Sequence, residues 1–335
     1  TNHQYMMFFT QKGKCFWMRV YEIPEGSKTA KGRAIQNLVN IESDDKVKAF
    51  ICTQDLKDKD YINSHNLIMV TKKGQVKKTS LEKYSKPRVN GVAAITIKEG
   101  DELLEAKLTN GESQIILAVK SGKLVRFEET KTRPMGRTAS GVRGITLKDD
   151  TDEVIGMVTV DKDDINDSQI LVVTENGYGK RTKLVDEDGE DAYRITNRGG
   201  KGVKTLNITE KTGKLISINA VTDADDLMII NKSGLTIRMA IEDLRVMGRA
   251  TQGVKLINLK GKDSIAAVTK VMKDDVAEVV VDEDGNVIET EAIERIKPVL
   301  EILEDEGVEE DEEEDDVEED EDDEASEGDD EDDEV

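Results

Sequence analysis

A short phrase recurs five times along the chain, and this repetition constrains the fold more than any other feature of the sequence. Each copy has an apolar stretch, a tight turn closed by glycine, and a second stretch that ends in basic residues. The five turn glycines are Gly13, Gly74, Gly122, Gly177 and Gly234. Recurrence of this kind indicates one structural unit that is repeated along the chain.

A second phrase, also centred on glycine, follows each copy of the first one. It reads KTAKGRAIQNLVNI (28–41), RVNGVAAITI (88–97), RTASGVRGITL (137–147), RGGKGVKTLNI (198–208) and RATQGVKLINL (249–259). An acidic turn and another apolar stretch then close each unit. The repeats predicted from these phrases cover about 6–54, 66–110, 114–160, 169–221 and 226–271, within a folded domain of residues 1–273.

The repeats have the composition of β-strands and tight turns. Their apolar residues are largely β-branched, and their turns carry Gly with Asn, Ser or Lys, as in Asn176-Gly177. Four strands fit into a unit of roughly 50 residues, which predicts an all-β, propeller-like array of four-stranded blades. Each blade would bury its faces against its neighbours. Aromatic residues make up only 4% of the chain, so Leu, Ile, Val and Met must fill the core.

The charge of the chain is strongly segregated. The whole chain has a net charge of −24, but residues 1–273 alone carry +9. Residues 301–335 hold 26 acidic residues and no basic one. A basic body with an acidic tail points to a polyanionic partner. We expect residues 274–300 to be a linker and residues 301–335 to be disordered, because so few apolar groups cannot offset the entropy of ordering.

The composition also excludes several classes of protein. No apolar run approaches the ~18 residues of a membrane span. Two cysteines, Cys15 and Cys52, cannot build a disulfide framework, which favours a reducing compartment such as the cytoplasm. Two histidines leave little room for a metal site, and no acid–base or nucleophile arrangement is apparent. We therefore expect no catalytic residue, no metal and no cofactor in this chain.

One copy of the second phrase resembles a known motif. Asn197–Gly202 (NRGGKG) is close to the gyrase box, Gln-Arg-Arg-Gly-Gly-Lys-Gly, found in the C-terminal domain of the bacterial DNA gyrase A protein. NGYGKRT (176–182), MGRTASGVRGI (135–145) and VMGRATQGVKLI (246–257) are similar to the same family, and the resemblance extends to about residue 271. It implies a β-pinwheel, a propeller-like disc whose blades exchange a strand with their neighbours. Family members usually have six blades with the full box in the first, so we expect that blade and the breakage-reunion domain to precede this chain.

The resemblance also implies a function. The intact enzyme of the family is a type II topoisomerase of two A and two B subunits, which introduces negative supercoils with ATP and Mg²⁺. This chain would wrap duplex DNA and break no bond itself. The equivalent domain of topoisomerase IV is an alternative, although RGGKG favours gyrase. A propeller scaffold that binds proteins is an alternative from another class, and it would show no steep salt dependence.

Glycine-rich loops beside Arg and Lys suit phosphate, because glycine lets N–H groups approach an oxyanion and the cations add charge. The second phrases and the basic ends of the first phrases therefore supply the candidate DNA-binding residues. They are Lys28, Lys31, Arg33, Lys77, Lys78, Arg88, Arg126, Arg137, Arg143, Lys180, Arg181, Arg198, Gly199, Gly200, Lys201, Gly202, Lys204, Arg238, Arg249 and Lys255.

In a simple four-strand meander, the second phrase of each repeat would lie at one end of its own blade and the acidic turn at the other end. The basic loops would then form a curved track that bends DNA. No recognition helix or aromatic platform is apparent, so we expect contacts to the backbone of duplex DNA that tolerate any base sequence.

The acidic tail has two interpretations. It can be a solubilising polyanion, or it can mimic DNA and compete for the basic loops. Residues 274–335 would reach ~45 Å as a flexible coil, and a tethered competitor can have an effective concentration near mM. The second interpretation predicts that removal of residues 301–335 tightens DNA binding.

Overall fold

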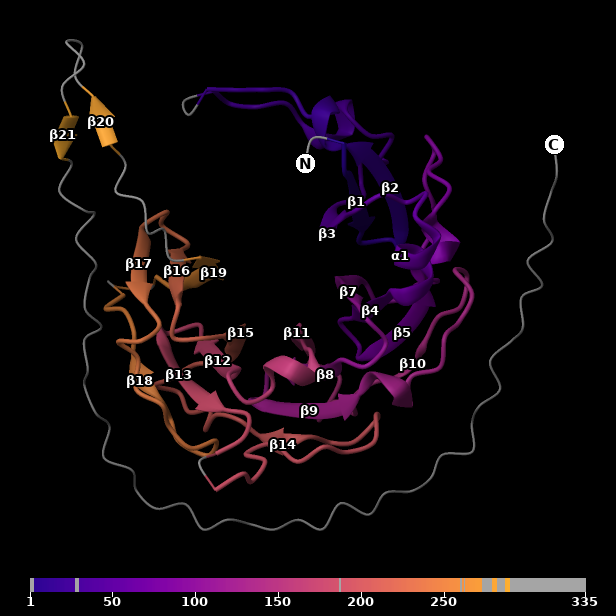
Figure 1. Ribbon diagram of the computed structural model, residues 1–335. Helices are drawn as coiled ribbons and strands as arrows, with labels where there is room; N and C mark the ends of the chain where they lie inside the picture. Colours follow the sequence, from indigo (N-terminus) through magenta and orange to yellow (C-terminus); the bar gives the residue numbers. More distant parts are fainter. Residues whose placement is uncertain are drawn as a thin grey trace.

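The structure is a computed structural model that describes residues 3–27, 30–186, 188–259, 261 and 263–272, and the backbone of 279–281 and 287–289. The regular structure of the described chain is mostly β-strand, arranged as five blades along an arc (Figure 1). A short α-helix, α1 (Lys59–Ser64), lies between the first two blades in sequence. The predicted all-β, propeller-like architecture is confirmed.

Each blade is built around an antiparallel hairpin that a first phrase forms. The hairpins are β1–β2 (Tyr5–Thr10, Lys14–Arg19), β4–β5 (Asn66–Thr71, Gln75–Ser80), β8–β9 (Gln114–Val119, Lys123–Glu128), β12–β13 (Gln169–Thr174, Tyr178–Lys183) and β16–β17 (Asp225–Asn231, Thr236–Ala240). The glycine that closes each hairpin turn has φ between 82° and 89°, a conformation that costs glycine little. The repeated glycine of the first phrase is thus explained by turn geometry.

The apolar stretch that closes each repeat forms the innermost strand of its blade. These strands are β3 (Val47–Thr53), β7 (Leu103–Thr109), β11 (Val154–Val160), β15 (Leu215–Val221) and β19 (Ile265–Met272). Each pairs with the first strand of its own hairpin. Consecutive inner strands also contact one another, so they line the inside of the arc in chain order (Figure 1).

The outermost strand of a blade comes from the next repeat. β6 (Val92–Ala93) pairs with β2, β10 (Val142–Arg143) with β5, β14 (Val203–Lys204) with β9, and β18 (Val254–Lys255) with β13. The first four blades therefore have four strands, for example in the order β3-β1-β2-β6. This is the strand exchange that the resemblance implied. The simple meander is wrong, because the second phrase crosses to the preceding blade instead of staying at the end of its own.

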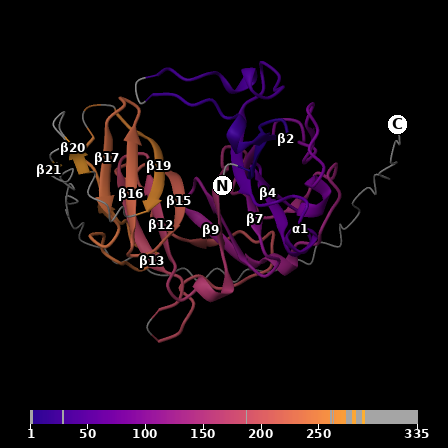
Figure 2. The same cartoon turned by 45° about the horizontal axis from the view of Figure 1, so that its top comes forward.

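The fifth blade has three strands within the described residues, in the order β17-β16-β19. The second phrase of the first repeat contributes no strand to any described sheet. Two glycines mark this difference: a Cβ built on Gly32 or Gly234 meets no atom within 4 Å, whereas one on Gly122 would stand 2.7 Å from the Leu206 oxygen. Blade 1 and blade 5 stand at the two ends of the arc, and the segments 24–27 and 30–34 extend away from blade 1 (Figures 1 and 2).

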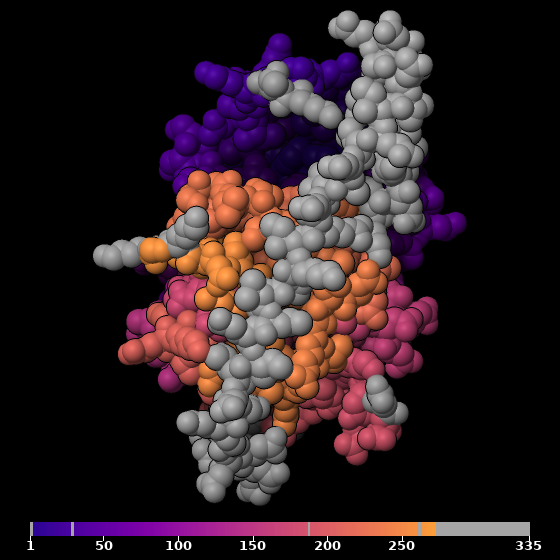
Figure 3. Space-filling model, turned by 90° about the vertical axis from the view of Figure 1, so that its left-hand side faces the viewer, coloured from indigo at the N-terminus to yellow at the C-terminus, as the bar shows by residue number. Residues whose placement is uncertain are grey.

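The hydrophobic core is divided into layers between adjacent blades. In β12, Leu171 and Val173 pack towards blade 5, where they meet Leu227 and Ile229. The alternate residues of the same strand, Ile170 among them, pack towards blade 3. Both faces of a central blade are therefore buried, and a blade depends on its neighbours for stability. Figure 3 shows the last two repeats stacked together, with the N-terminal repeat at the top of the view.

The sequence analysis also predicted a linker at residues 274–300 and an acidic tail at residues 301–335. Within residues 274–300, Val279–Val281 (β20) pairs with Val287–Glu289 (β21) in an antiparallel ribbon. The acidic tail, residues 301–335, lies outside the described residues. In the part of the chain that is described, no helix has the length and apolar character needed to cross a membrane.

Candidate nucleic-acid interface

The second phrases of repeats two to five lie along the outer rim of the arc, where β10, β14 and β18 are seen on the outside of the blades (Figure 1). Each phrase makes a turn and then enters its short strand. An arginine occupies each turn, and these arginines are Arg88, Arg137, Arg198 and Arg249. Strand exchange thus brings one arginine-bearing turn to the outer edge of each of the first four blades.

Successive second phrases are joined by hydrogen bonds. The Thr96 amide donates to the Ala139 oxygen at 3.2 Å, the Thr146 amide to the Gly200 oxygen at 3.0 Å, and the Asn207 amide to the Thr251 oxygen at 3.2 Å. The donors lie five residues after their phrase glycines, and the acceptors lie two residues before theirs. We call residues 88–97, 137–147, 198–208 and 249–259 the outer belt. Its turns are held in fixed succession because each phrase is hydrogen-bonded to the next.

The outer belt carries several of the predicted cations at its surface. Arg88, Arg143, Lys201 and Lys204 are exposed, while Arg137, Arg198, Arg249 and Lys255 are half-buried. The Arg198 Nε atom donates to the Lys131 oxygen at 3.2 Å, which ties this side chain to the preceding repeat. The structure brings these eight cations to one curved surface, where each segment of the outer belt contributes between one and three of them.

A further row of cations was missed in the sequence. Lys83, Arg133, Arg194 and Arg245 are all exposed, and each lies eight residues before the glycine of its second phrase. The signal was the constant spacing from that glycine, but the row falls outside the phrases themselves. It adds an exposed basic side chain four or five residues before the arginine of each turn in the outer belt.

Five predicted DNA contacts are wrong, because the side chains are buried. Lys77 and Lys180 are fully buried, and Lys78, Arg126 and Arg181 are at most 7% exposed. A cation inside the protein cannot reach a phosphate on a duplex. The strands that carry these residues are covered on both faces by neighbouring blades and by the second phrase of the next repeat.

Arg126 shows what these buried cations do instead. Its Nε atom donates to Gln114 Oε1 at 2.7 Å within its own blade, and its Nη1 atom donates to Asp191 at 2.7 Å and to the Tyr193 oxygen at 2.9 Å. Asp191 and Tyr193 belong to the next repeat, just before its second phrase. Arg126 therefore ties the blade to the chain segment that leads into the outer belt.

Arg181 and Lys78 make equivalent junctions. The Arg181 guanidinium donates to the Leu244 oxygen, to Gln169 and to Asp223. The Lys78 ammonium donates to the Glu129 oxygen at 3.1 Å. Burial lowers the pKa of Lys78 and raises the pKa of Glu129, so each group is less readily charged than in water.

The remaining predicted cations lie apart from the outer belt. Arg238 is half-buried, and its Nε atom donates to Asp226 Oδ2 at 2.7 Å. Lys31 and Arg33 are exposed on the segment of the first repeat that joins no described sheet. Lys28 lies outside the described residues. The structure does not bring Lys31, Arg33 or Arg238 to the rim surface formed by repeats two to five.

The three predicted glycines have two different roles. A Cβ on Gly202 would stand 2.6 Å from the Leu124 oxygen, so this glycine permits the exchanged strand to approach the preceding blade. Around Gly199 and Gly200 the nearest atoms are 3.8 Å and 3.9 Å away, which leaves the turn open. The Gly199 amide already donates to the Gly144 oxygen at 2.8 Å. Gly202 thus serves strand exchange, whereas the turn at Gly199 and Gly200 has room for a ligand.

The acidic turns lie beside the hairpin turns, where lysines neutralise them. Lys12 Nζ is 3.0 Å from Glu42 and 2.7 Å from Asp44, and Lys14 Nζ is 2.7 Å from Glu42. Hydrogen bonds from Lys14 and Lys12 lower the pKa of Glu42 to about 2. These carboxylates are therefore ionised and paired at neutral pH.

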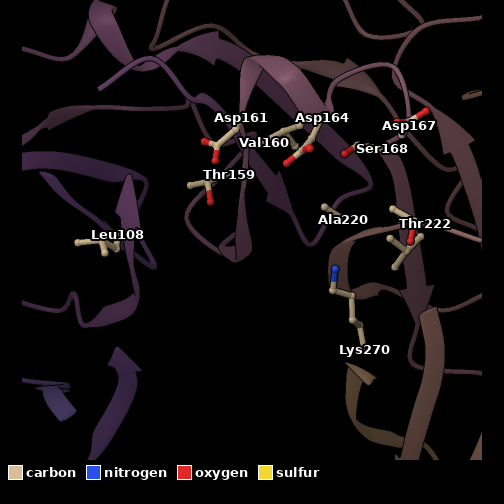
Figure 4. Close-up of a pocket in the computed structure, with 11 residues that line it drawn as sticks. Leu108, Thr159, Val160, Asp161, Asp164, Asp167, Ser168, Ala220, Thr222 and Lys270 are labelled. Carbon is tan, nitrogen blue, oxygen red and sulfur yellow. The ribbon is translucent and has the colours of Figure 1, made fainter. Parts of the chain in front are cut away.

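A cavity of about 370 Å³ lies on the inner side of the arc, and it is unsuited to a polyanion. Asp161, Asp164 and Asp167 line it, with Lys270 on the facing strand (Figure 4). Three carboxylates against one ammonium would repel phosphate groups. Of the two surfaces, the outer belt is therefore the better suited to a polyanion.

Comparison with known proteins agrees with this architecture. A family model described as "DNA gyrase C-terminal domain, beta-propeller" matches residues 4–54, 65–110, 114–161, 168–222 and 225–272. The chain is 39% identical over 298 residues to the DNA gyrase A protein of Staphylococcus aureus strain MRSA252, covering 88% of this chain and 32% of that protein. It is 40% identical over 274 residues to the gyrase A protein of strain NCTC 8325, covering 82% and 29%. The chain thus spans about a third of the length of the curated relatives it matches.

Two solved structures share the fold. The C-terminal domain of DNA topoisomerase IV superposes with a TM-score of 0.70 at 23% identity, covering 81% of this chain and 80% of that one. The DNA gyrase A C-terminal domain gives 0.66 at 22% identity, covering 81% and 84%. Together with the repeats and exchanged strands, the family match shows that the chain belongs to the family of DNA gyrase C-terminal domains with a beta-propeller fold.

Proposed function

We propose that the outer belt binds duplex DNA through its phosphate groups and bends the duplex around the rim. The observation that carries this proposal is the succession of hydrogen-bonded turns, each with an arginine, along one curved surface. Arginine forms bidentate hydrogen bonds with phosphate, and a fixed turn limits the entropy that is lost on binding. Family membership supports the same partner.

The belt has the chemistry for backbone contacts and lacks the chemistry for reading bases. Its four segments contain no aromatic residue on which a base could stack. The described chain offers no recognition helix, since α1 has six residues. Binding of this kind tolerates any base sequence and depends on the deformability of the duplex.

Bending sets the number of contacts that are required. To bend a 20–30 bp site by 40–90° costs about 1–6 kcal/mol, so several phosphate contacts must offset it. Each contact should add about −0.9 to the slope of log K against log salt. The four turns supply one arginine each. The row of Lys83, Arg133, Arg194 and Arg245 supplies four more cations, so enough are available for several phosphate contacts.

The test is ligation of nicked circular DNA in the presence of the protein, at two salt concentrations. The wild-type chain should shift the linking number, and the triple variant Arg137→Glu, Arg198→Glu, Arg249→Glu should not. The triple variant Lys162→Glu, Lys211→Glu, Lys232→Glu is the matched control, because these three lysines are exposed, lie outside the outer belt and undergo the same total change of charge. Equal loss with the control would mean that overall charge and not the belt is responsible. DNA binding without salt dependence would contradict phosphate contacts. A lack of DNA binding even at low salt would favour a scaffold that binds proteins.

The acidic tail would regulate this binding. The 26 acidic residues of 301–335 can compete with DNA for the outer belt, because they are tethered to it at high effective concentration. A chain that ends at residue 300 should therefore bind DNA more tightly than the full chain at the same salt concentration. Equal affinity would leave the tail with a solubilising role.

The wider role follows from the relatives. We propose that the chain acts as the DNA-wrapping part of a gyrase A protein, in an A2B2 type II topoisomerase of the bacterial cytoplasm that introduces negative supercoils. ATP and Mg²⁺ would serve the intact enzyme, and no residue of this chain is assigned to them. The test is a supercoiling assay with the intact enzyme carrying the triple arginine substitution. Relaxation without supercoiling is the expected result, as the domain delivers DNA and does not cut it.

A further inference from the structure

Two fully buried lysines lie directly beneath turns of the outer belt. Lys77 in β5 and Lys180 in β13 are each the third residue after the hairpin glycine, and both are 0% exposed. The same position holds Phe16, Val125 and Ile237 in the other three blades. A buried ammonium is costly unless its hydrogen bonds are satisfied, so the partners of these two lysines explain their presence.

Both lysines donate to the main chain of the arginine-bearing turns. The Lys180 ammonium donates to the oxygen atoms of Gly248 and Arg249, and to Thr251 Oγ1 at 3.1 Å. The Lys77 ammonium donates to the Arg137 oxygen, and to the Ala94 oxygen at 2.7 Å. Arg137 and Arg249 occupy the same place, four residues before the glycine of their second phrases.

We propose that Lys77 and Lys180 are positioning residues for DNA binding, which fix the backbone of the Arg137 and Arg249 turns so that these arginines face the duplex. This inference rests on the proposed function of the outer belt. An ammonium has three N–H donors, and for Lys180 the Arg249 turn supplies three acceptors, namely the Gly248 and Arg249 oxygens and Thr251 Oγ1. The backbone of the turn is then ordered before DNA arrives, and the arginine side chain alone is ordered on binding.

The turn between them is built differently. In blade 3 the position of the two lysines holds Val125, whose side chain cannot donate a hydrogen bond, and the Arg198 turn contains Gly199 and Gly200. A threonine holds this turn from the side, since Thr146 Oγ1 donates to the Gly199 oxygen at 2.6 Å, and the equivalent Thr96 Oγ1 donates to the Thr138 oxygen of the Arg137 turn. The difference between the two turns is therefore the buried lysine. From Arg137 to Arg249 the belt therefore has a lysine-clamped turn, a glycine-rich turn and a second lysine-clamped turn. The Arg198 turn provides an internal control for the two lysines.

The test is a double-mutant cycle for DNA affinity in the full 335-residue chain. Lys180→Met should weaken binding about fivefold, and its effect should largely disappear in the Arg249→Ala background, because the two residues act as one unit. The effects of Lys180→Met and Arg198→Ala should multiply. Equal coupling to both arginines, or to neither, would overturn the positioning role. Lys77→Met with Arg137→Ala repeats the cycle at the other clamp, and Lys180→Gln, which retains a donor, covers the case in which Lys180→Met does not fold.

A second measurement does not depend on DNA. Hydrogen exchange of the amides of residues 247–252 should become faster in Lys180→Met, whereas that of residues 197–201 should not change. Unchanged exchange at residues 247–252 would contradict the clamp itself. If the wild-type chain binds no DNA but exchange changes as expected, the proposed function fails while the clamp stands.

Discussion

Gly141 lies against the main-chain oxygen of Val76 so closely that a Cβ built on Gly141 would stand 2.6 Å from it. Val142, the next residue, pairs with Val76 in the exchanged strand. The contact joins two repeats, since Val76 belongs to blade 2 and Gly141 to the phrase that follows blade 3's hairpin. The glycine of the second phrase is therefore a requirement of strand exchange.

Substitution of this glycine should destabilise the domain. Gly141→Ala adds a clash with backbone to the strain of a side chain at φ 88°, and we expect a loss of about 2–4 kcal/mol. Gly32→Ala is the control, because Gly32 has a φ of 71° but no atom within 4 Å of a built Cβ. It should lose only about 1 kcal/mol, from backbone strain. Urea denaturation of the two variants measures the difference, and equal losses would mean that the clash is relieved at no cost.

The buried arginines should matter for stability and not for surface charge. Arg126→Leu leaves Gln114, Asp191 and the Tyr193 oxygen without their donor, and should cost about 2–4 kcal/mol. Arg143→Leu removes the same charge from an exposed position of the outer belt, and should change the unfolding free energy by less than about 0.5 kcal/mol. Denaturation midpoints check both. A small loss for Arg126→Leu would indicate that the junction between the two repeats rearranges around the smaller leucine side chain.

The repeat pattern predicted the blades because glycine at positive φ is needed in every hairpin, at Gly122 as at Gly177. It could not predict where the second phrase pairs. A strand of two residues such as Val203–Lys204 has the same sequence spacing whether it joins its own blade or the preceding one. Contacts between repeats decide which blade this strand joins, and the spacing of residues within one repeat does not depend on those contacts.

The burial of strand cations was also missed, for a related reason. A lysine or arginine on a strand is usually solvated, but both faces of these blades are covered, so Arg126 and Arg181 are buried. A signal was present: Gln114 precedes Arg126 by 12 residues, and Gln169 precedes Arg181 by the same interval. A polar residue that recurs 12 residues before each of these two strand arginines indicates a satisfied buried pair.

The row of cations beside the belt should contribute to DNA affinity. If Arg194 contacts a phosphate, Arg194→Ala should weaken binding and reduce the magnitude of the salt slope by about 0.9. Arg133 and Arg245 occupy the same position in their repeats, so the triple alanine variant should reduce it by about 2.7. Binding measured over a series of salt concentrations gives the slope. An unchanged slope would place the duplex on the belt turns alone, away from this row.

The ion pairs at the hairpin end of blade 1 should make stability depend on acid pH. Lys14 and Lys12 lower the pKa of Glu42 from 4.5 to about 2, because both ammonium groups hydrogen-bond its carboxylate in the folded state. The unfolded chain therefore binds the proton more readily, and the stabilisation is present above pH 4.5 and lost as the pH falls towards 2. Glu42→Gln should be less stable than wild type at neutral pH, and the difference should vanish near pH 2.

Urea denaturation of both proteins across this pH range, at low and at high salt, makes the measurement. Because Glu42 is exposed, the difference at neutral pH should shrink at high salt, where ions screen the pair. Asp44, whose pKa is also lowered by Lys12, offers a second substitution, Asp44→Asn, with the same expected sign. A difference between wild type and Glu42→Gln that persists unchanged to pH 2 would show that the amide alters packing, and that the ion pair is not the cause.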